Sequence, residues 1–437
     1  MKRRSSIAFG FLALILIGAG LLASPFARVE GVFGDYYRAL FTATSAVCVT
    51  GLTVSDIAAE YTRSGQIVLM TLVEIGCLGL MTFGTFLMIA IGRRLSLSRE
   101  FSLMNAYGVE QIQGLKGLIC WVIGTMLMVE GIGAILLYHR FGDWYASIFY
   151  AVMSFCNAGF GIYSGSLARF ASDPYVLMVL AGETILGGIG FLVVYNLCTF
   201  WIRRRKSGGK GRLSLHTNVV LRFTLYLLVI AFVGFLALEW DGVLAGLSVP
   251  AKLYTGFYQA VTPRTCGFTV VPVEALRPLT RLLYEVMMFI GGAPGSAAAG
   301  IKVTTLAVLI YTLRAMCRGE QETVISRRVV SYDTVRESIV IFMAMTTLVV
   351  LVMGALTYTE AQSGISSEAL FFEAVSAITT TGLSIGDTTI SLSWAGKAVI
   401  MVAMFFGRLG ALTVVMMIGD RETTRFIRYP AEELVVG

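Results

Sequence analysis

The chain has 437 residues, of which 56% are hydrophobic and only 14% charged, and its mean hydropathy is +0.78. A soluble protein of this length would carry more charge on its surface, so the composition excludes that class and indicates a protein embedded in the lipid bilayer. The net charge of +7 comes from a few basic segments and gives no reason to expect nucleic acid as a partner.

Eight apolar runs follow one another along the chain, each near or above the roughly 20 residues that cross the hydrocarbon core of a membrane. They lie at 7–23, 66–91, 118–137, 175–201, 221–238, 282–313, 339–357 and 398–418. Basic residues precede the first run, as in a signal peptide, but Pro25 interrupts the only small-residue cleavage site, so we interpret this run as a retained span. The sequence therefore predicts an all-α membrane protein with eight full spans.

Lys and Arg are distributed unequally between the two sides of these spans. With the N-terminus inside, the cytoplasmic segments hold 21 of the 34 basic residues, whereas the outer segments hold ten, among them Arg264. The inside segments are 2–4, 93–116, 203–212, 314–336 and 421–428. This is the positive-inside distribution, and it predicts a multi-pass protein of the cell inner (plasma) membrane with both termini in the cytoplasm.

The polar residues offer little for catalysis. The seven cysteines are scattered and form no C-x-x-C pair, and His139 and His216 are the only histidines. We therefore expect no disulfide framework, no zinc site, no organic cofactor and no enzymatic activity.

A moderately apolar segment ending in glycine follows the first, third, fifth and seventh runs. The four segments read FTATSAVCVTGL (41–52), FYAVMSFCNAGF (149–160), FYQAVTPRTCGF (257–268) and FEAVSAITTTGL (372–383). When their glycines are aligned, Phe stands ten residues earlier and Leu or Phe follows in every copy, and the glycines are 108, 108 and 115 residues apart. This pattern indicates four tandem parallel repeats.

Each repeat is interpreted as a span, a pore half-helix, a glycine loop and a second span. The repeats cover 5–92, 117–203, 218–315 and 337–420, and a cytoplasmic tail covers 421–437. A segment such as 35–46 reaches only about 18 Å as a helix, too short to cross the membrane. It must enter from outside and return as a loop, which membranes tolerate where protein or a water-filled cavity surrounds the backbone. Four such loops entering from one face can enclose a single central pore.

The glycine loops have the chemistry of a cation selectivity filter. Backbone carbonyls can replace the hydration shell of a cation, glycine permits the backbone angles that this requires, and the half-helix C-termini favour positive charge. The predicted ion-binding residues are Val49, Thr50, Gly51, Asn157, Ala158, Gly159, Thr265, Cys266, Gly267, Thr380, Thr381 and Gly382, with the carbonyls of Thr50, Ala158, Cys266 and Thr381 facing the ion. The alternative is that these glycines only let helices pack closely. Cys48, Cys156 and Cys266 are interpreted as small apolar spacers.

The run FIGGAPGSAAAGIK (289–302) cannot form a good helix, because Pro294 removes a hydrogen bond and glycine has little helix propensity. We expect it to break the second span of the third repeat and to obstruct the path beneath the filter. The alternative is a simple kink with close helix packing. The expected gating residues are Gly291, Gly292, Pro294, Gly295, Ser296, Gly300, Lys302 and Arg408. Lys302 would either face the cavity or snorkel to the cytoplasmic edge.

Arg408 lies deep in an apolar run, which is costly unless the side chain faces water or a partner. Facing the pore, it would repel a cation. The alternative is an ion pair with a buried carboxylate. The candidates are Glu74, Glu130, Glu183, Glu285 and Glu373, for most of which we expect structural hydrogen bonds.

Together, the four glycine loops, GGAPGSAAAGIKVTT (291–305) and GRLGALT (407–413) resemble the superfamily of potassium transporters that includes KtrB and TrkH. The resemblance covers the whole chain, and the ending RYPAEELVVG (428–437) is more similar to KtrB. It implies that potassium is transported, that Gly51, Gly159, Gly267 and Gly382 form the filter, that 291–300 is an intramembrane gating loop and that Arg408 is a barrier.

The resemblance also implies partners. These are a second copy in a homodimer with one pore per subunit, and a cytosolic ring of nucleotide-binding RCK-type (KtrA-like) regulatory subunits. The ring would dock on inside segments at 93–116, 203–217 and 314–336, which are otherwise ordinary solvated loops.

The sequence is compatible with other functions. The main alternatives are a sodium-coupled secondary cation transporter, with sodium as coupling ion or regulator, and a less selective monovalent cation channel. Many secondary transporters have inverted repeats, whereas the repeats here are parallel. A membrane enzyme lacks support because no cluster of His, Asp and Glu has ligand spacing. A pore for neutral solutes is a further rival.

Overall fold

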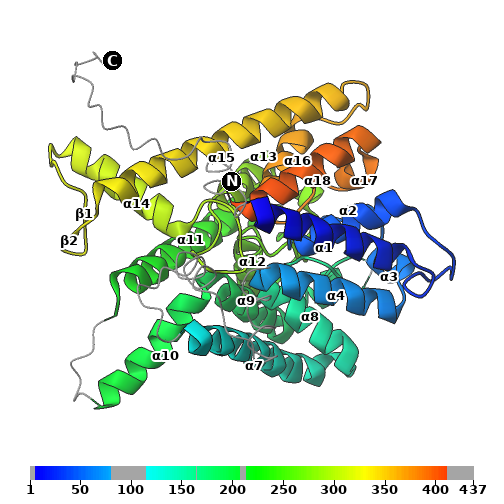
Figure 1. Ribbon diagram of the computed structural model, residues 1–437, viewed down its shortest axis with the longest axis horizontal. Coiled ribbons are helices and arrows are strands. Elements are labelled where there is room, and N and C mark those ends of the chain that lie inside the picture. The colour runs from blue at the N-terminus through cyan, green and yellow to red at the C-terminus, as the bar shows by residue number, and fades with distance from the viewer. Residues whose placement is uncertain (1–4, 80–114, 164, 207–212, 411–437) are drawn as a thin grey trace.

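The computed structural model describes residues 5–79, 115–163, 165–206 and 213–410, and these residues are mostly helical (Figure 1). The first group of helices contains α1 (Ser5–Ala23), α2 (Tyr36–Val47), α3 (Ile57–Glu60) and α4 (Arg63–Leu78). The second contains α7 (Leu115–Phe141), α8 (Trp144–Cys156), the 3-10 helix η1 (Ala168–Phe170), α9 (Pro174–Ile189) and α10 (Phe191–Lys206).

The third group contains α11 (Leu215–Glu239), α12 (Val249–Val261), the 3-10 helix η2 (Val273–Ala275), α13 (Pro278–Phe289) and α14 (Val303–Cys317). A small antiparallel hairpin of β1 (Val324–Ile325) and β2 (Arg328–Val329) follows. The fourth group contains α15 (Tyr332–Thr359), α16 (Ser367–Ile378), α17 (Thr388–Ser391) and α18 (Trp394–Leu409). The expected tail at 421–437 and most of the inside segment at 93–116 lie outside the described residues.

The four groups follow one another around a common centre. In Figure 1 the first group (blue) lies on the right, the second (teal) below, the third (green) on the left and the fourth (yellow to red) at the top. In each group, the first helix of 12 or more residues after the central helix contacts the central helix of the next group: α4 contacts α8, α9 contacts α12, α13 contacts α16, and α18 contacts α2. The contacts therefore form a closed cycle.

The short central helices α2, α8, α12 and α16 have 12 or 13 residues, which is about 18–20 Å of helix. Polar caps start three of them. The side chain of Asp35 accepts a hydrogen bond from the Tyr37 amide, Asp143 accepts one from Tyr145, and Ser366 accepts one from Ala369. These caps satisfy free amides at the helix start, and the C-terminal ends are buried in the middle of the molecule.

The helices that follow the glycine loops end earlier than their apolar runs. Gly79, Gly190 and Gly410 terminate α4, α9 and α18 with φ values of +76°, +93° and +82° and ψ near 140°. Only glycine adopts this backbone readily. The expectation of a continuous span over 175–201 is therefore wrong: α9 and α10 meet at an angle of 94°. In the third group the helix stops at Phe289 and resumes at Val303, over the glycine- and proline-rich run.

Three helices of the described chain, α7, α11 and α15, are long and apolar enough to cross a membrane, and the bent pair of α9 and α10 adds a fourth. The helices α4 and α18 each have 16 described residues, and the remainder of their apolar runs lies outside the described part. The fold is that of a mostly helical membrane protein, and the count of eight spans stays a prediction.

Candidate functional site

The four glycines aligned in the sequence meet in the middle of the molecule. A Cβ built on Gly51 would lie 2.7 Å from the amide nitrogen of Gly159, and one built on Gly159 would lie 2.6 Å from the carbonyl carbon of Gly267. A Cβ on Gly267 would lie 2.6 Å from the carbonyl oxygen of Thr381, and one on Gly382 would lie 3.2 Å from Cα of Gly51. Each loop thus touches the next, and the fourth returns to the first.

The backbone before each glycine has the same unusual conformation. Val49, Asn157, Thr265 and Thr380, each two residues before its glycine, have φ values of +57°, +58°, +68° and +50°. Valine and threonine rarely adopt positive φ, because the branched Cβ crowds the backbone. Such strain persists where the surrounding structure imposes it and is frequent at functional sites. We call 49–51, 157–159, 265–267 and 380–382 the glycine segments.

Hydrogen bonds from the central helices support the glycine segments. The amide nitrogens of Thr50, Ala158 and Thr381 each donate over 2.8 Å to the carbonyl five residues earlier. In the third segment the bond of Cys266 goes to Thr262 instead, over 3.1 Å. The first, second and fourth segments therefore share one turn, and the third departs from it.

Two polar side chains of the central helices hold the residue two positions after the glycine. The Gln259 amide donates to the Thr269 hydroxyl over 3.1 Å, and the buried Glu373 carboxylate accepts from the Ser384 hydroxyl over 2.9 Å. Glu373 also accepts from Thr389. Side chains of α12 and α16 therefore hold the backbone that follows the third and fourth glycine segments.

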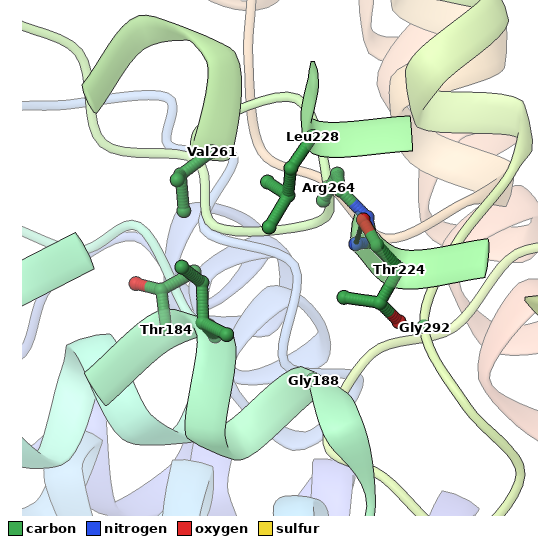
Figure 2. A pocket seen from close by; sticks show the side chains of 8 residues that line it. Thr184, Gly188, Thr224, Leu228, Val261, Arg264 and Gly292 are labelled. Carbon is green, nitrogen blue, oxygen red and sulfur yellow. Dashed lines mark hydrogen bonds between the residues drawn. The ribbon is translucent and has the colours of Figure 1, made fainter. Parts of the chain in front are cut away.

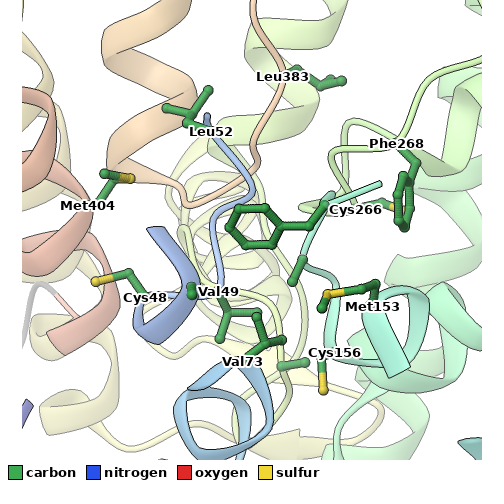
Figure 3. Close-up of a cluster of buried hydrophobic side chains, with 14 of the residues drawn as sticks. Cys48, Val49, Leu52, Val73, Met153, Cys156, Cys266, Phe268, Leu383 and Met404 are labelled. Atoms are coloured by element: carbon green, nitrogen blue, oxygen red, sulfur yellow. The ribbon is translucent and has the colours of Figure 1, made fainter. Parts of the chain in front are cut away.

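Apolar side chains surround the glycine segments, as Figure 3 shows for Val49, Leu52, Phe268 and Leu383. Cys48, Cys156 and Cys266 are buried in the same cluster and carry free thiols. No group of metal-ligating side chains is found within the described residues.

Hydroxyls of the glycine segments are buried without partners. In the described chain, the Oγ1 atoms of Thr50, Thr265 and Thr380 form no hydrogen bond. Buried hydroxyls normally find a hydrogen-bond partner, so three such oxygens within the glycine segments are unusual. A cavity of about 170 Å³ lined by Gly51, Gly382, Ser384 and Asp387 opens beside the first and fourth segments.

The segment between α13 and α14, which we call loop 290–302, is held by the end of α9. The amides of Ala293 and Ala297 donate to the carbonyls of Gly188 (2.9 Å) and Gly187 (3.2 Å). The amide of Phe191, just after the bend at Gly190, donates in turn to the carbonyl of Gly295 over 3.0 Å. The early end of α9 frees the polar groups that bind this loop.

The two ends of loop 290–302 also bind each other. The amide of Ile301 donates to the Phe289 carbonyl over 3.0 Å, and that of Val303 donates to the Gly292 carbonyl over 3.1 Å. A Cβ on Gly292 would lie 2.6 Å from the Gly188 carbonyl oxygen, so glycine is needed for the close approach to α9. Gly295 and Gly300 have φ values of +67° and +71°, and the Ser296 hydroxyl donates to the Ala293 carbonyl over 2.6 Å.

Arg408 reaches loop 290–302 from α18. Its guanidinium donates to the carbonyl of Ala297 over 2.6 Å and to the carbonyls of Gly76 (2.5 Å) and Cys77 (3.2 Å) at the end of α4. The ion pairs among the described residues are Arg28–Glu60, Arg38–Asp35, Arg140–Asp173 and Arg281–Glu368. Arg408 therefore joins the loop to two neighbouring groups through backbone carbonyls, and a carboxylate partner is not found in the described part of the chain.

Lys302 turns back onto the loop instead of toward the membrane edge, because its ammonium donates to the Ala298 carbonyl over 2.6 Å. The buried glutamates behave differently from one another. Glu373 accepts hydrogen bonds, whereas both carboxyl oxygens of Glu183 lack a partner in the described chain and pack against Gly133. Glu183 is therefore an exception among these glutamates, for most of which structural hydrogen bonds stay a prediction.

Arg264, counted with the outer segments on the sequence alone, has a buried side chain and lies three residues before Gly267. A signal was present in the alignment, since Cys48, Cys156 and Thr379 occupy the equivalent positions. A position that is small and uncharged in three repeats is one that the fold buries.

Comparisons with known proteins identify the class. A family model described as "TrkH: Cation transport protein" matches residues 13–422, and the chain therefore belongs to this family of cation transport proteins. The chain is 36% identical over 440 residues to the Ktr system potassium uptake protein B of Bacillus subtilis (strain 168), covering 99% of this chain and 96% of that protein. The resemblance to the KtrB and TrkH superfamily is thus confirmed.

Two further relatives extend the comparison. The Potassium/sodium uptake protein NtpJ of Enterococcus hirae is 35% identical, over 99% of this chain and 96% of that protein. The crystal structure of the potassium transporter TrkH from Vibrio parahaemolyticus matches with a TM-score of 0.73 at 16% identity, covering 94% of this chain and 85% of that one. The structural match shows a shared fold.

Proposed function

We propose that the protein takes up potassium ions across the plasma membrane through one pore per chain, with the four glycine segments as its selectivity filter. The observation that carries the proposal is the closed cycle of contacts among Gly51, Gly159, Gly267 and Gly382. Carbonyls at such a junction can replace the hydration shell of a cation. The buried, unpartnered hydroxyls of Thr50, Thr265 and Thr380 support the same assignment.

Loop 290–302 is proposed as the gate beneath the filter. Its amides are tied to α9 and its carbonyl at Ala297 to Arg408, so its position depends on contacts from two other groups of helices. Arg408 places a positive charge at this level, which opposes a cation in a low-dielectric environment. The residues proposed for gating are those expected from the sequence, with the carbonyls of Gly187 and Gly188 added.

The test is uptake of radioactive rubidium or potassium into proteoliposomes, with and without competing sodium. The proposal expects saturable uptake that excess potassium inhibits much more strongly than excess sodium. Uptake of sodium as fast as potassium would support the second candidate, a less selective or sodium-coupled cation transporter, which the name of the Enterococcus relative favours. Lack of any cation flux would reject both.

The assembly proposed for the protein is a homodimer with a cytosolic ring of nucleotide-binding RCK-type subunits. The hairpin of β1 and β2 and the exposed end of α14 form a projection that such a ring could contact (Figure 1). Native mass spectrometry of the purified protein tests the dimer, and co-purification with an RCK-type subunit in the presence of nucleotide tests the ring.

A further inference from the structure

Arg264 is a buried cation for which the structure shows no carboxylate partner among the described residues. Its residue exposure is 8%, and it takes part in none of the ion pairs between described side chains. The guanidinium keeps its charge under all ordinary conditions, so burial requires compensation by hydrogen bonds. A residue that served only to fill space would not need this charge.

The compensation comes from two backbone carbonyls. One guanidinium nitrogen donates to the Thr224 carbonyl on α11 over 3.5 Å, and the other donates to the Gly291 carbonyl of loop 290–302 over 3.3 Å. Both bonds are long for charged donors, and Nε has no partner within the described chain. The guanidinium is therefore weakly held and sensitive to the position of either acceptor.

A small cavity adjoins this side chain. Arg264, Thr224 and Gly292 line a cavity of about 10 Å³, close to the space of one water molecule (Figure 2). Figure 2 shows Thr184 and Gly188 of α9 across this cavity from the guanidinium. The side chain thus lies where the second and third groups of helices and the loop come together.

The hydrogen bond from Arg264 to Gly291 depends on the position of the neck of loop 290–302. Gly291 lies at the neck of loop 290–302, next to the paired residues Ile290 and Ile301. A Cβ on Gly291 would lie 2.8 Å from the Ala299 carbonyl carbon, so the two sides of the neck are packed together. A displacement of the neck by about an ångström would take the 3.3 Å bond out of hydrogen-bonding range.

Arg264 is also part of the chain that leads directly into a glycine segment, with Thr265 at φ +68° as its neighbour. Arg264 immediately precedes the third glycine segment, and its side chain donates a hydrogen bond to Gly291 of the loop. Within the described residues, no other hydrogen bond joins a glycine segment, or the residue before one, to loop 290–302. Arg408 holds the loop too, but from α18, without covalent continuity to a glycine segment.

We propose that Arg264 is a positioning residue that couples the third filter segment to the gating loop. When the neck is in place, the bond to Gly291 restrains the guanidinium and, through it, the backbone of 265–267. When the loop moves, that restraint is lost and the third segment relaxes. Coupling of this kind is reciprocal, so an ion in the filter must also stabilise the loop. The inference rests on the proposed function, because it takes the glycine segments as the filter.

The experiment measures amide hydrogen exchange of residues 290–303 in the full-length protein in lipid nanodiscs, in potassium chloride and in choline chloride. In the wild type, potassium should slow exchange of this segment about fivefold or more, the range of ordinary coupling energies. Arg264→Gln should exchange at the same rate in both salts. Arg408→Gln should exchange faster in both salts and keep the potassium-dependent difference.

A flux measurement separates the outcomes. Arg264→Gln should raise rubidium flux and also lower the preference for potassium over sodium, whereas Arg408→Gln should raise flux alone. If Arg264→Gln does not yield folded protein, Arg264→Lys keeps the charge, loses the paired donors and should show a reduced potassium-dependent difference. A difference that persists undiminished in the variant, or that is missing in the wild type, overturns the coupling. If the wild type itself shows no potassium preference in flux, the proposed function fails instead.

Discussion

At the scale of single residues, the glycines at the centre are distinguished by what a side chain would meet. Gly51 and Gly267 combine positive φ with a backbone neighbour of another repeat within 2.7 Å of a built Cβ. A side chain there is strained by the backbone angle and also displaces the adjoining loop. Gly159 has a close backbone neighbour but no positive φ, so a side chain at this position is excluded by lack of space and not by the backbone angle.

Replacing Gly51 or Gly267 by Ser should therefore reduce discrimination between potassium and sodium, because the new Cβ moves the carbonyls of the neighbouring segment. We expect the ratio of rubidium to sodium flux in proteoliposomes to fall by about tenfold, as for a change of 1.4 kcal/mol in relative binding. Gly182→Ser is the matched control, since nothing lies within 4 Å of a Cβ at that position. An unchanged ratio in both variants would exclude the glycine segments as the selectivity filter.

Gly187 would not serve as a control, although the sequence predicts no role for it in the filter. From the sequence, Gly187 is a glycine near the site that should matter little for selectivity. In the structure its carbonyl accepts the Ala297 amide, and a Cβ would strike the Phe155 carbonyl. The register of the four glycines repeats in the sequence and could be predicted, whereas the neighbours of Gly187, Phe155 and Ala297, are about 30 and 110 residues away along the chain and could not be.

At the scale of elements, loop 290–302 depends on the helices around it. Its residues predict that it is not helical, because proline and glycine disfavour a helix. The early ends of α4, α9 and α18 were not predicted, since one glycine in an apolar run costs a helix only about 1 kcal/mol. The positive φ of Val49 could not be predicted either, because valine rarely adopts positive φ and tertiary packing imposes it here.

Arg408 is expected to keep the loop in the obstructing position. Arg408→Gln removes the charged donors to Ala297, Gly76 and Cys77. Since a hydrogen bond from a charged group contributes about 1.5–3 kcal/mol, rubidium flux should rise on the order of tenfold while ion preference stays the same. Arg140→Gln, at an exposed ion pair with Asp173, should leave flux unchanged. Flux at or below the wild-type level in folded Arg408→Gln would favour a purely structural kink.

The bend at Gly190 gives a second test of the same element. Gly190→Ala places a Cβ 2.9 Å from the Pro294 carbonyl oxygen, at a φ of +93° that alanine rarely adopts. Strain of this kind costs about 1–3 kcal/mol, and it falls on the contact between α9 and the loop. We expect the melting temperature in detergent to fall by several degrees and flux to rise. Gly131→Ala on α7, where nothing lies within 4 Å of a Cβ, should change neither.

At the scale of the whole molecule, the cyclic contacts α4–α8, α9–α12, α13–α16 and α18–α2 are those expected if the four parallel repeats predicted from the sequence place all four central helices on one side. A parallel arrangement of this kind fixes the direction of every long helix once one is known. The helix α15, with 28 residues, is about 42 Å long and runs from the β1–β2 hairpin to the loop before α16. The hairpin and η1 should therefore lie on opposite sides of the membrane.

This topology is tested by single cysteines in a variant whose exposed native cysteines, Cys120, Cys198 and Cys317, are replaced by Ser. Arg327→Cys, in the turn of the hairpin, should react with a membrane-impermeant maleimide only when the reagent has access to the cytoplasmic face, as in permeabilised cells. Arg169→Cys, in η1, should react in intact cells, because η1 follows a glycine segment on the proposed outer side. The positive-inside distribution of Lys and Arg gives the same orientation. Labelling of Arg327→Cys in intact cells would reverse the orientation and place the glycine segments on the cytoplasmic side.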